Sequence, residues 1–303
     1  MGSLYQVESA EGMVELIAPA IRRIMAANPS QMTFTGTNTY LVGHTDIAVI
    51  DPGPDDPNHL ANILNAIEPG TQITKILVTH SHLDHSPLAK ALSKSSSAKI
   101  YAYGDSFAGR SIEMEALAKL GTIGGGEGVD IAFKPDIKLP DGAELEHGNE
   151  LISGIWTPGH FGNHMVYSYR KYLFCGDHVM GWASSMISPP DGDLSAFRRS
   201  CNRLLTRQET DYLPGHGEPI EDGPSRVRWL LAHRDKREKQ IIVMLAQKPD
   251  NARGLAQRIY TDIDSRLISA ATRNVLAHLI DLNTRNIISA QGLLNHDTKY
   301  YLL

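Results

Sequence analysis

The octapeptide THSHLDHS, residues 79–86, concentrates side chains that bind metals in one short stretch. Its candidate ligands are His80, His82, Asp84 and His85. In a turn after a strand these side chains cannot all point one way, so two outward pairs are expected, His80 with His82 and Asp84 with His85. Neutral imidazole and carboxylate both bind first-row divalent metals. Because one metal needs three or four protein ligands, the stretch supplies about half of each of two sites.

The missing ligands are expected from the ends of other predicted strands. Three motifs offer them: His160 in TPGH, Asp177 in CGDH and His216 in PGHG. A glycine stands beside each of these residues and lets the backbone approach closely. A lone histidine is more often a packing or surface residue, but coincidence explains poorly why all seven candidates end predicted strands. The pattern therefore predicts a centre for two metal ions.

The order and spacing of these motifs resemble the metallo-β-lactamase superfamily. The segments TGTNTYLVG at 35–43 and IDPGP at 50–54 are similar to the first hairpin of that superfamily. The helical tail after Pro224 resembles the branch of lactamase-β-like protein 2, which is related to glyoxalase II and carries a C-terminal winged-helix-like domain. The resemblance implies an α/β fold, a four-layer αβ/βα sandwich with metals at one edge.

The resemblance also implies a role for each candidate. The first metal would be held by His80, His82 and His160, the second by Asp84, His85 and His216, with Asp177 bridging them. Two divalent ions, zinc first and iron or manganese as alternatives, would lower the pKa of a shared water to near 7. The resulting hydroxide would attack a carbonyl carbon or a phosphorus. Asp84 would also be catalytic, because it would orient that hydroxide.

Several neighbours have two open interpretations. Asp51 is either a turn carboxylate or, as the resemblance implies, an anchor for the histidine turn. His164 and His178 either contact the substrate or the ligands, or pack in the interior. The loop 181–194 follows Asp177, and loops at strand ends select substrates. Its candidates for the substrate wall are Trp182, Ser184 and Ser185.

Short strands alternate with helices through the first 220 residues. Helical spacing appears in NHLANILNAI and in SPLAKALSK, where Ser86 is the expected N-cap. Residues 104–135 interrupt the alternation with a short helix and a glycine-rich connector, and this insertion could cover an active site. After Pro224 three helical stretches and a hairpin follow, which is the winged-helix pattern. The predicted domains are residues 1–223, catalytic, and 224–303, winged-helix-like.

Composition and charge limit the remaining choices. The chain is 42% hydrophobic and 21% charged, without an apolar run that could span a membrane or a secretion signal. Two cysteines are too few for a disulfide framework, so a reducing cytoplasm is expected. Residues 224–303 hold 13 Lys and Arg against 7 Asp and Glu, although the whole chain has a net charge of −5. The basic tail indicates either an anionic partner or a solvated helical surface.

Four functions remain open. We favour a hydrolase of a small carbonyl substrate, a thioester, ester or lactone. A single-strand-specific endoribonuclease is the alternative, since the basic tail suits a phosphate backbone, whereas the acidic body would repel it. A β-lactamase with weak activity is the second alternative, against which Asp177 speaks. A winged-helix regulator with a vestigial metal site is disfavoured by the complete ligand set. A homo-oligomer is a further open alternative.

Overall fold

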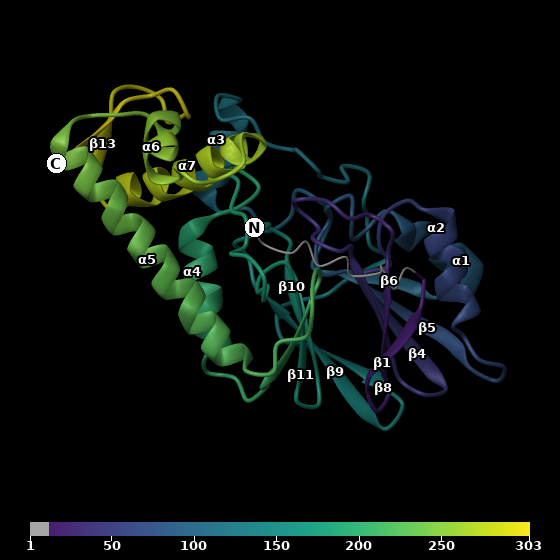
Figure 1. The fold of residues 1–303 in the computed structure, drawn as a ribbon. Coiled ribbons are helices and arrows are strands. Elements are labelled where there is room, and N and C mark those ends of the chain that lie inside the picture. The colour runs from purple at the N-terminus through teal and green to yellow at the C-terminus, as the bar shows by residue number, and fades with distance from the viewer. Residues whose placement is uncertain (1–11) are drawn as a thin grey trace.

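Two β-sheets lie face to face in the computed structural model, which describes residues 12–303 (Figure 1). The predicted absence of a secretion signal falls largely outside this range. The first sheet contains, in spatial order, β1 (Val14–Ala18), β2 (Ile21–Met25), β3 (Asn38–Val42), β4 (Asp46–Ile50), β5 (Gln72–Leu77), β6 (Lys99–Ala102) and β7 (Ile137–Lys138). The second contains β12 (Asp211–Pro214), β11 (Tyr172–Gly176), β10 (Met165–Tyr169), β9 (Glu150–Trp156) and β8 (Ala143–His147).

Strand pairing brings the chemistry-bearing segments to one edge. Strands β4 to β7 pair in parallel, and β11 pairs in parallel with β12. The carboxyl ends of parallel strands meet at the same edge of a sheet. Strands β3 and β10 are buried along their whole length, because each sheet is covered on both faces.

Helices cover the outer face of each sheet, which confirms the predicted four-layer sandwich. On the first sheet lie α1 (Pro57–Asn65) and α2 (Leu88–Ser96), and their Ile63 and Leu92 pack onto Leu41 and Ile76. On the second lie α4 (Leu194–Leu204) and the start of α5 (Gly223–Gln247). Between the sheets, large side chains such as Tyr167 and Phe174 fill the central core.

The expected cap of α2 is wrong. The helix begins after Pro87, and no side chain caps it. Ser86 instead donates its hydroxyl to Asp130 Oδ2 at 2.9 Å and to the carbonyl of His82 at 3.2 Å. The serine therefore ties the histidine turn to the 104–135 insertion rather than starting the helix.

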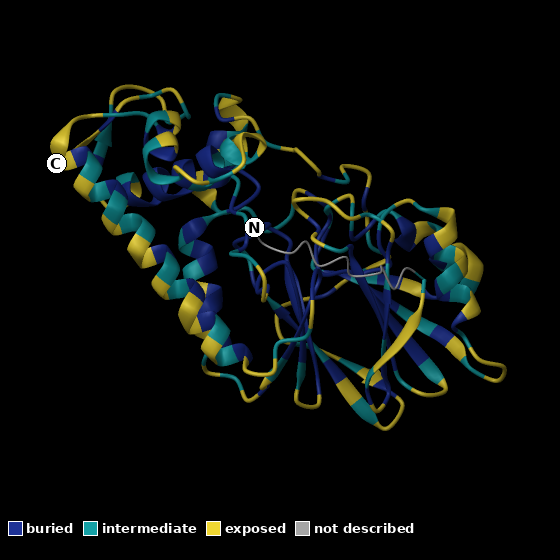
Figure 2. Cartoon of the chain, in the orientation of Figure 1, coloured by how far each residue is buried: buried dark blue, intermediate teal, exposed yellow. Residues whose placement is uncertain are grey.

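The tail has the predicted three helices and hairpin. They are α5, α6 (Ala252–Ile259), α7 (Ile268–Thr284) after a 3-10 turn at Ser265–Leu267, and the strands β13 (Ile288–Ala290) and β14 (Tyr300–Leu302). Buried residues run through both sheets and along α7 (Figure 2). Within residues 12–303, no helix is long and apolar enough to cross a membrane.

Helix α5 belongs to two cores. Its Val227 and Leu230 pack with the second sheet, whereas its Ile241 and Leu245 pack with α6 and α7. The insertion helix α3 (Ile112–Leu120) also joins the tail core, a contact that the sequence did not indicate. The predicted boundary after residue 223 stays a prediction.

Candidate metal centre

All seven predicted ligands converge at the sheet edge described above. The turn 80–85 follows β5, His160 lies between β9 and β10, Asp177 follows β11, and His216 follows β12. Their ligand atoms form three overlapping groups, within each of which the atoms lie no more than 4.8 Å apart. The groups are His80–His82–His160, His80–His85–Asp177 and Asp84–His85–His216.

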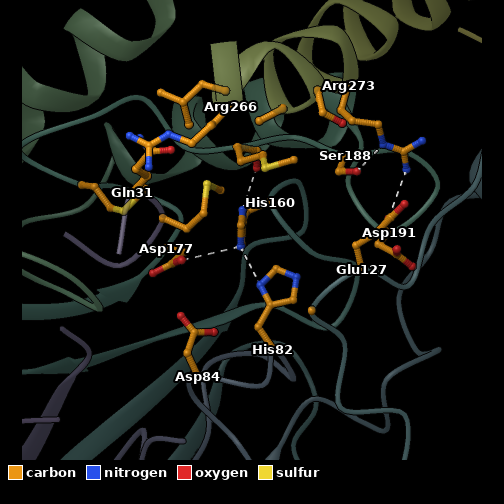
Figure 3. A pocket seen from close by; sticks show the side chains of 17 residues that line it. Gln31, His82, Asp84, Glu127, His160, Asp177, Ser188, Asp191, Arg266 and Arg273 are labelled. Carbon is orange, nitrogen blue, oxygen red and sulfur yellow. Dashed lines mark hydrogen bonds and ion pairs between the residues drawn. The ribbon is translucent and has the colours of Figure 1, made fainter. Parts of the chain in front are cut away.

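The first group is made of three imidazoles. His82 Nδ1 lies 2.9 Å from His80 Nε2 and 3.1 Å from His160 Nε2. Both distances join ring nitrogens, so three lone-pair positions point toward one small space; Figure 3 shows His82 and His160 facing each other. His82 is the member that uses its Nδ1 atom.

The group of Asp84, His85 and His216, called the second group from here on, combines two imidazoles with a carboxylate. His216 Nε2 lies 3.1 Å from Asp84 Oδ2 and 3.3 Å from His85 Nε2. Asp177 lies between the two groups: its Oδ2 is 3.4 Å from His216 Nε2 and 3.8 Å from His160 Nε2, and its Oδ1 is 3.5 Å from His85 Nε2. Asp177 thus has the position that a bridging carboxylate requires.

These residues fit a pair of divalent cations. Two atoms that bind one tetrahedral zinc ion at roughly 2.0–2.2 Å lie roughly 3.3–3.6 Å apart, which the observed separations bracket. Asp177 Oδ1 is buried and has no hydrogen-bond partner among residues 12–303. A buried unpaired carboxylate oxygen is costly, and a cation would satisfy it. The donor set of nitrogen and oxygen suits zinc, iron or manganese.

The outer nitrogens of the imidazoles are held in place. His160 Nδ1 donates to the carbonyl of Met186 at 2.7 Å, and His216 Nδ1 donates to the carbonyl of Gly36 at 3.1 Å. His85 Nδ1 lies 2.9 Å from Asp51 Oδ2. Such bonds leave the inner nitrogen free to bind a metal and fix the ring orientation. The Met186 and Gly36 carbonyls carry no signal in the sequence.

Of the two interpretations left open for Asp51, the hydrogen bonds favour the anchor of the histidine turn. Its Oδ1 accepts the backbone N–H of Thr79, and its Oδ2 accepts the Thr79 hydroxyl, both at 2.7 Å. His80 Nδ1 in turn lies 3.0 Å from that hydroxyl. One buried carboxylate therefore orients His85 directly and His80 through Thr79. The threonine is adjacent to the histidine cluster in the sequence but was not singled out there.

The two groups differ in their preferred protonation. Burial lowers the pKa of His82 to about 3, and the nearby His160 acts in the same direction. Burial would also lower the pKa of His216, but Asp177 and Asp84 raise it to about 9. Burial opposes ionisation of Asp84, yet His85 and His216 hold its pKa below the usual range. The first group thus offers free lone pairs, and the second favours positive charge beside its carboxylates.

Glycines allow the backbone to approach the candidate ligands this closely, as the sequence predicted. A Cβ atom on Gly215 would lie 2.6 Å from both Asp177 Oδ1 and His85 Cε1. A Cβ atom on Gly176 would lie 2.7 Å from His164 Nε2. Side chains at these positions would therefore displace the cluster.

A cavity of about 470 Å³ opens over the ligands His82, Asp84, His160 and Asp177. It is also lined by the insertion, through Glu127 and Gly128, which agrees with the expected cover. The tail adds a wall that the sequence did not predict, from Arg266 to Arg273 (Figure 3).

The expected wall residues of the 181–194 loop are wrong. Trp182, Ser184 and Ser185 are not among the residues that line this cavity, whereas Met180, Met186 and Ser188 are. Ser185 is buried and donates its hydroxyl to the carbonyl of His178 at 2.7 Å. Trp182 is partly exposed and stacks on Phe34 at 4.9 Å between ring centroids, outside the cavity.

His164 and His178 pack behind the ligands and do not line the cavity. The His164 ring lies 5.1 Å from that of His80, and its Nδ1 lies 3.0 Å from Thr157 Oγ1. The His178 ring lies 4.6 Å from Phe197. Both side chains are buried, but His164 also lies against the ligand His80, so for this residue interior packing and contact with a ligand go together.

Comparison with known proteins agrees with the geometry. The profile described as the Metallo-beta-lactamase superfamily matches residues 32–216, and the Beta-lactamase associated winged helix domain matches residues 252–293. A beta-lactamase-like protein 2 homolog of Drosophila melanogaster is 29% identical over 280 residues, with 89% of each chain covered. This similarity confirms the resemblance that the sequence motifs indicated.

Two further proteins are informative. An atrochrysone carboxyl ACP thioesterase of a Cryptosporiopsis species is 26% identical over 247 residues, which cover 80% of this chain and 68% of that one. The crystal structure of a beta-lactamase domain protein from Burkholderia ambifaria superposes with a TM-score of 0.81 at 22% identity, covering 99% of this chain and 96% of that one. The similarity to the Burkholderia ambifaria structure shows that the two chains share a fold.

Proposed function

Because the chain belongs to the metallo-beta-lactamase superfamily, we propose that it is a hydrolase with two divalent metal ions, zinc in first place. The observation that carries this proposal is the pair of three-residue groups with Asp177 between them. His80, His82 and His160 would hold one ion, and Asp84, His85 and His216 the other. Two such ions would acidify a shared water and polarise the bond to be cleaved.

Asp84 is the proposed catalytic carboxylate. It lines the cavity, and its side chain is 26% exposed, compared with 10% for Asp177. Its Oδ2 faces His216, so the carboxylate remains ionised and can accept a hydrogen bond from a water in the cavity. This bond would orient the attacking oxygen toward the substrate.

The substrate we propose is a small molecule with a carbonyl carbon, such as a thioester, ester or lactone. A cavity of about 470 Å³ has the size of ordinary small-molecule sites. A thioesterase among the relatives supports the same class. Binding of a phosphate backbone would need free cations at the cavity, but Arg273 is held by Ser188, and Arg266, although exposed, is paired with Asp264. Two free buried cysteines suit a cytoplasmic location.

A side-by-side assay tests the proposal. Zinc-loaded protein would be offered thioesters, lactones, a β-lactam and labelled single-stranded RNA, together with Asp84→Asn and the exposed control Asp55→Asn. We expect thioester hydrolysis that falls about 10²–10⁴-fold in Asp84→Asn and is unchanged in the control. RNA cleavage that needs Asp84 and weakens steeply with salt, without thioester hydrolysis, would replace this function with a nuclease.

A further inference from the structure

The cavity has an apolar wall beyond the metal ligands. Its apolar side chains are Met32, Met180, Met186, Leu267 and Ala270. They come from three separate segments: the β2–β3 connection, the loop after β11, and the start of α7. Methionine is flexible and polarisable, so such a wall adapts to apolar groups of varied shape.

The charged groups of the same cavity are engaged by the protein. Arg273 donates Nε to Ser188 Oγ at 2.8 Å and its two terminal nitrogens to the carbonyls of Ile123 and Pro189. Asp191 accepts from Arg110 at 2.5 Å and from the Gly126 N–H at 2.6 Å. These groups shape the wall and leave little capacity for a charged ligand.

Arg266 is engaged as well, although it is exposed. Its Nη2 donates to Asp264 Oδ2 at 2.6 Å and its Nε to Oδ1 at 3.0 Å. Gln31 donates to the same carboxylate at 3.2 Å, which joins the tail to the β2–β3 connection above the ligands (Figure 3). Apart from Glu127, which is largely exposed and 3.7 Å from Arg273, the cavity surface that remains without internal partners is therefore mainly that of the methionines and Leu267.

We infer that this wall binds an apolar acyl chain, so that the substrate is a thioester of an uncharged aliphatic acid. The inference rests on the proposed function, because the scissile carbonyl must lie at the metal ligands. The tail domain then selects the substrate through Leu267 and Ala270. Met186, in the loop after β11, also carries the carbonyl that orients His160, which places the acyl chain directly beside the reacting bond.

An acyl series with one constant thiol tests this inference. From acetyl through butyryl and hexanoyl to octanoyl thioester, kcat/KM should rise about fourfold for each methylene that enters the wall. Leu267→Gln should lower kcat/KM for octanoyl roughly three- to tenfold and leave acetyl unchanged. Leu293→Gln is the matched control, because Leu293 is an exposed tail leucine that does not line the cavity.

A binding measurement separates this inference from the proposed function. Ketone analogues with a methylene in place of the thioester sulfur would be titrated calorimetrically into the same variants. If affinity increases with acyl length but no turnover is detected, the proposed hydrolase function is wrong and the proposed acyl-binding wall is retained. The acyl site would be overturned if turnover and binding did not change with acyl length, or if they changed instead with the length of the thiol. A preference for succinyl over butyryl would overturn it as well.

Discussion

Three of the imidazoles at the centre each have a hydrogen-bond partner behind the ring. His160 and His216 are hydrogen-bonded to backbone carbonyls, and His85 is hydrogen-bonded to Asp51. The ligands themselves were predictable, because residue type and spacing carry that information. The carbonyls of Met186 and Gly36 were not, since any residue offers a carbonyl and only the folded backbone aims it.

The Gly215→Ala variant tests how tightly the ligands are packed. Gly215 has no need of a left-handed backbone, so the effect of the methyl group is steric: it would lie 2.6 Å from Asp177 Oδ1 and His85 Cε1. We expect weaker binding of the second metal ion and a loss of about 1–3 kcal/mol in the free energy of unfolding. Chelator competition and urea denaturation measure the two effects.

Gly181→Ala is the matched control for that variant. The nearest atom to its added Cβ would be Ile220 Cγ1 at 3.4 Å, an ordinary contact. Equal metal affinity in Gly215→Ala and Gly181→Ala would show that the ligand cluster tolerates displacement, contrary to this account.

Among the elements, α5 and α7 support the loop that carries Met186. Arg234 of α5 is buried and, among the described residues, pairs with no carboxylate. It donates to the carbonyl of Ser185 and, at 3.1 Å, to Asn274 Oδ1 of α7. Asn274 Oδ1 also accepts the Ile187 N–H at 3.1 Å. The two helices thus fix the backbone on either side of the carbonyl that orients His160.

Arg234→Met should weaken metal binding through His160. The substitution keeps an unbranched side chain but leaves the Ser185 carbonyl without its buried donor, at a cost of about 1–3 kcal/mol in folding stability. Zinc affinity should fall about 10–100-fold, the usual effect of losing an outer partner. Arg237→Met on the same helix is the control, because Arg237 packs on Tyr260 instead. An unchanged zinc affinity in Arg234→Met would show that α5 does not influence metal binding at the site.

Helix positions followed from the sequence more reliably than their contacts did. The apolar spacing of α1, α5 and α7 predicted each helix because it reports the buried face. The cap at Ser86 failed because the hydroxyl found tertiary partners, Asp130 and His82. The wall at Trp182 and Ser185 failed because the sequence does not show which way an irregular loop turns its side chains.

At the scale of the whole molecule, buried histidines make the fold sensitive to acid. Burial, with Arg234 nearby, lowers the pKa of His278, and neither ring nitrogen has a hydrogen-bond partner within residues 12–303. Below about pH 6.5, His278 becomes protonated in the unfolded chain but stays neutral in the folded chain. The free energy of unfolding therefore falls as pH drops from 7 to 5.

His278→Leu should flatten that dependence in metal-free protein. The slope should decrease by up to about 1.4 kcal/mol per pH unit, the value for one proton. Leucine removes two unpaired polar atoms, so stability at pH 5 should rise. Urea denaturation at pH 5, 6 and 7 measures the slope, with the exposed His44→Leu as control. An identical slope in parent and His278→Leu would mean that His278 protonates without unfolding.

The sandwich and the winged helix followed from the motifs, but their joint cavity did not. Leu267 and Ala270 line the cavity over the predicted ligands because the tail docks on the second sheet, through α5, which is shared by two cores, and through Ala277 of α7. Long-range docking of this kind leaves no local pattern in a sequence.

Elemental analysis of reconstituted protein tests the central claim most directly. Apo-protein would be reloaded with zinc, passed through a desalting column and measured together with His216→Ala. We predict close to two zinc ions per chain, and close to one in the variant, which retains the group of three imidazoles. A chain that retains no zinc, or a variant that retains as much as its parent, would contradict the two-metal centre.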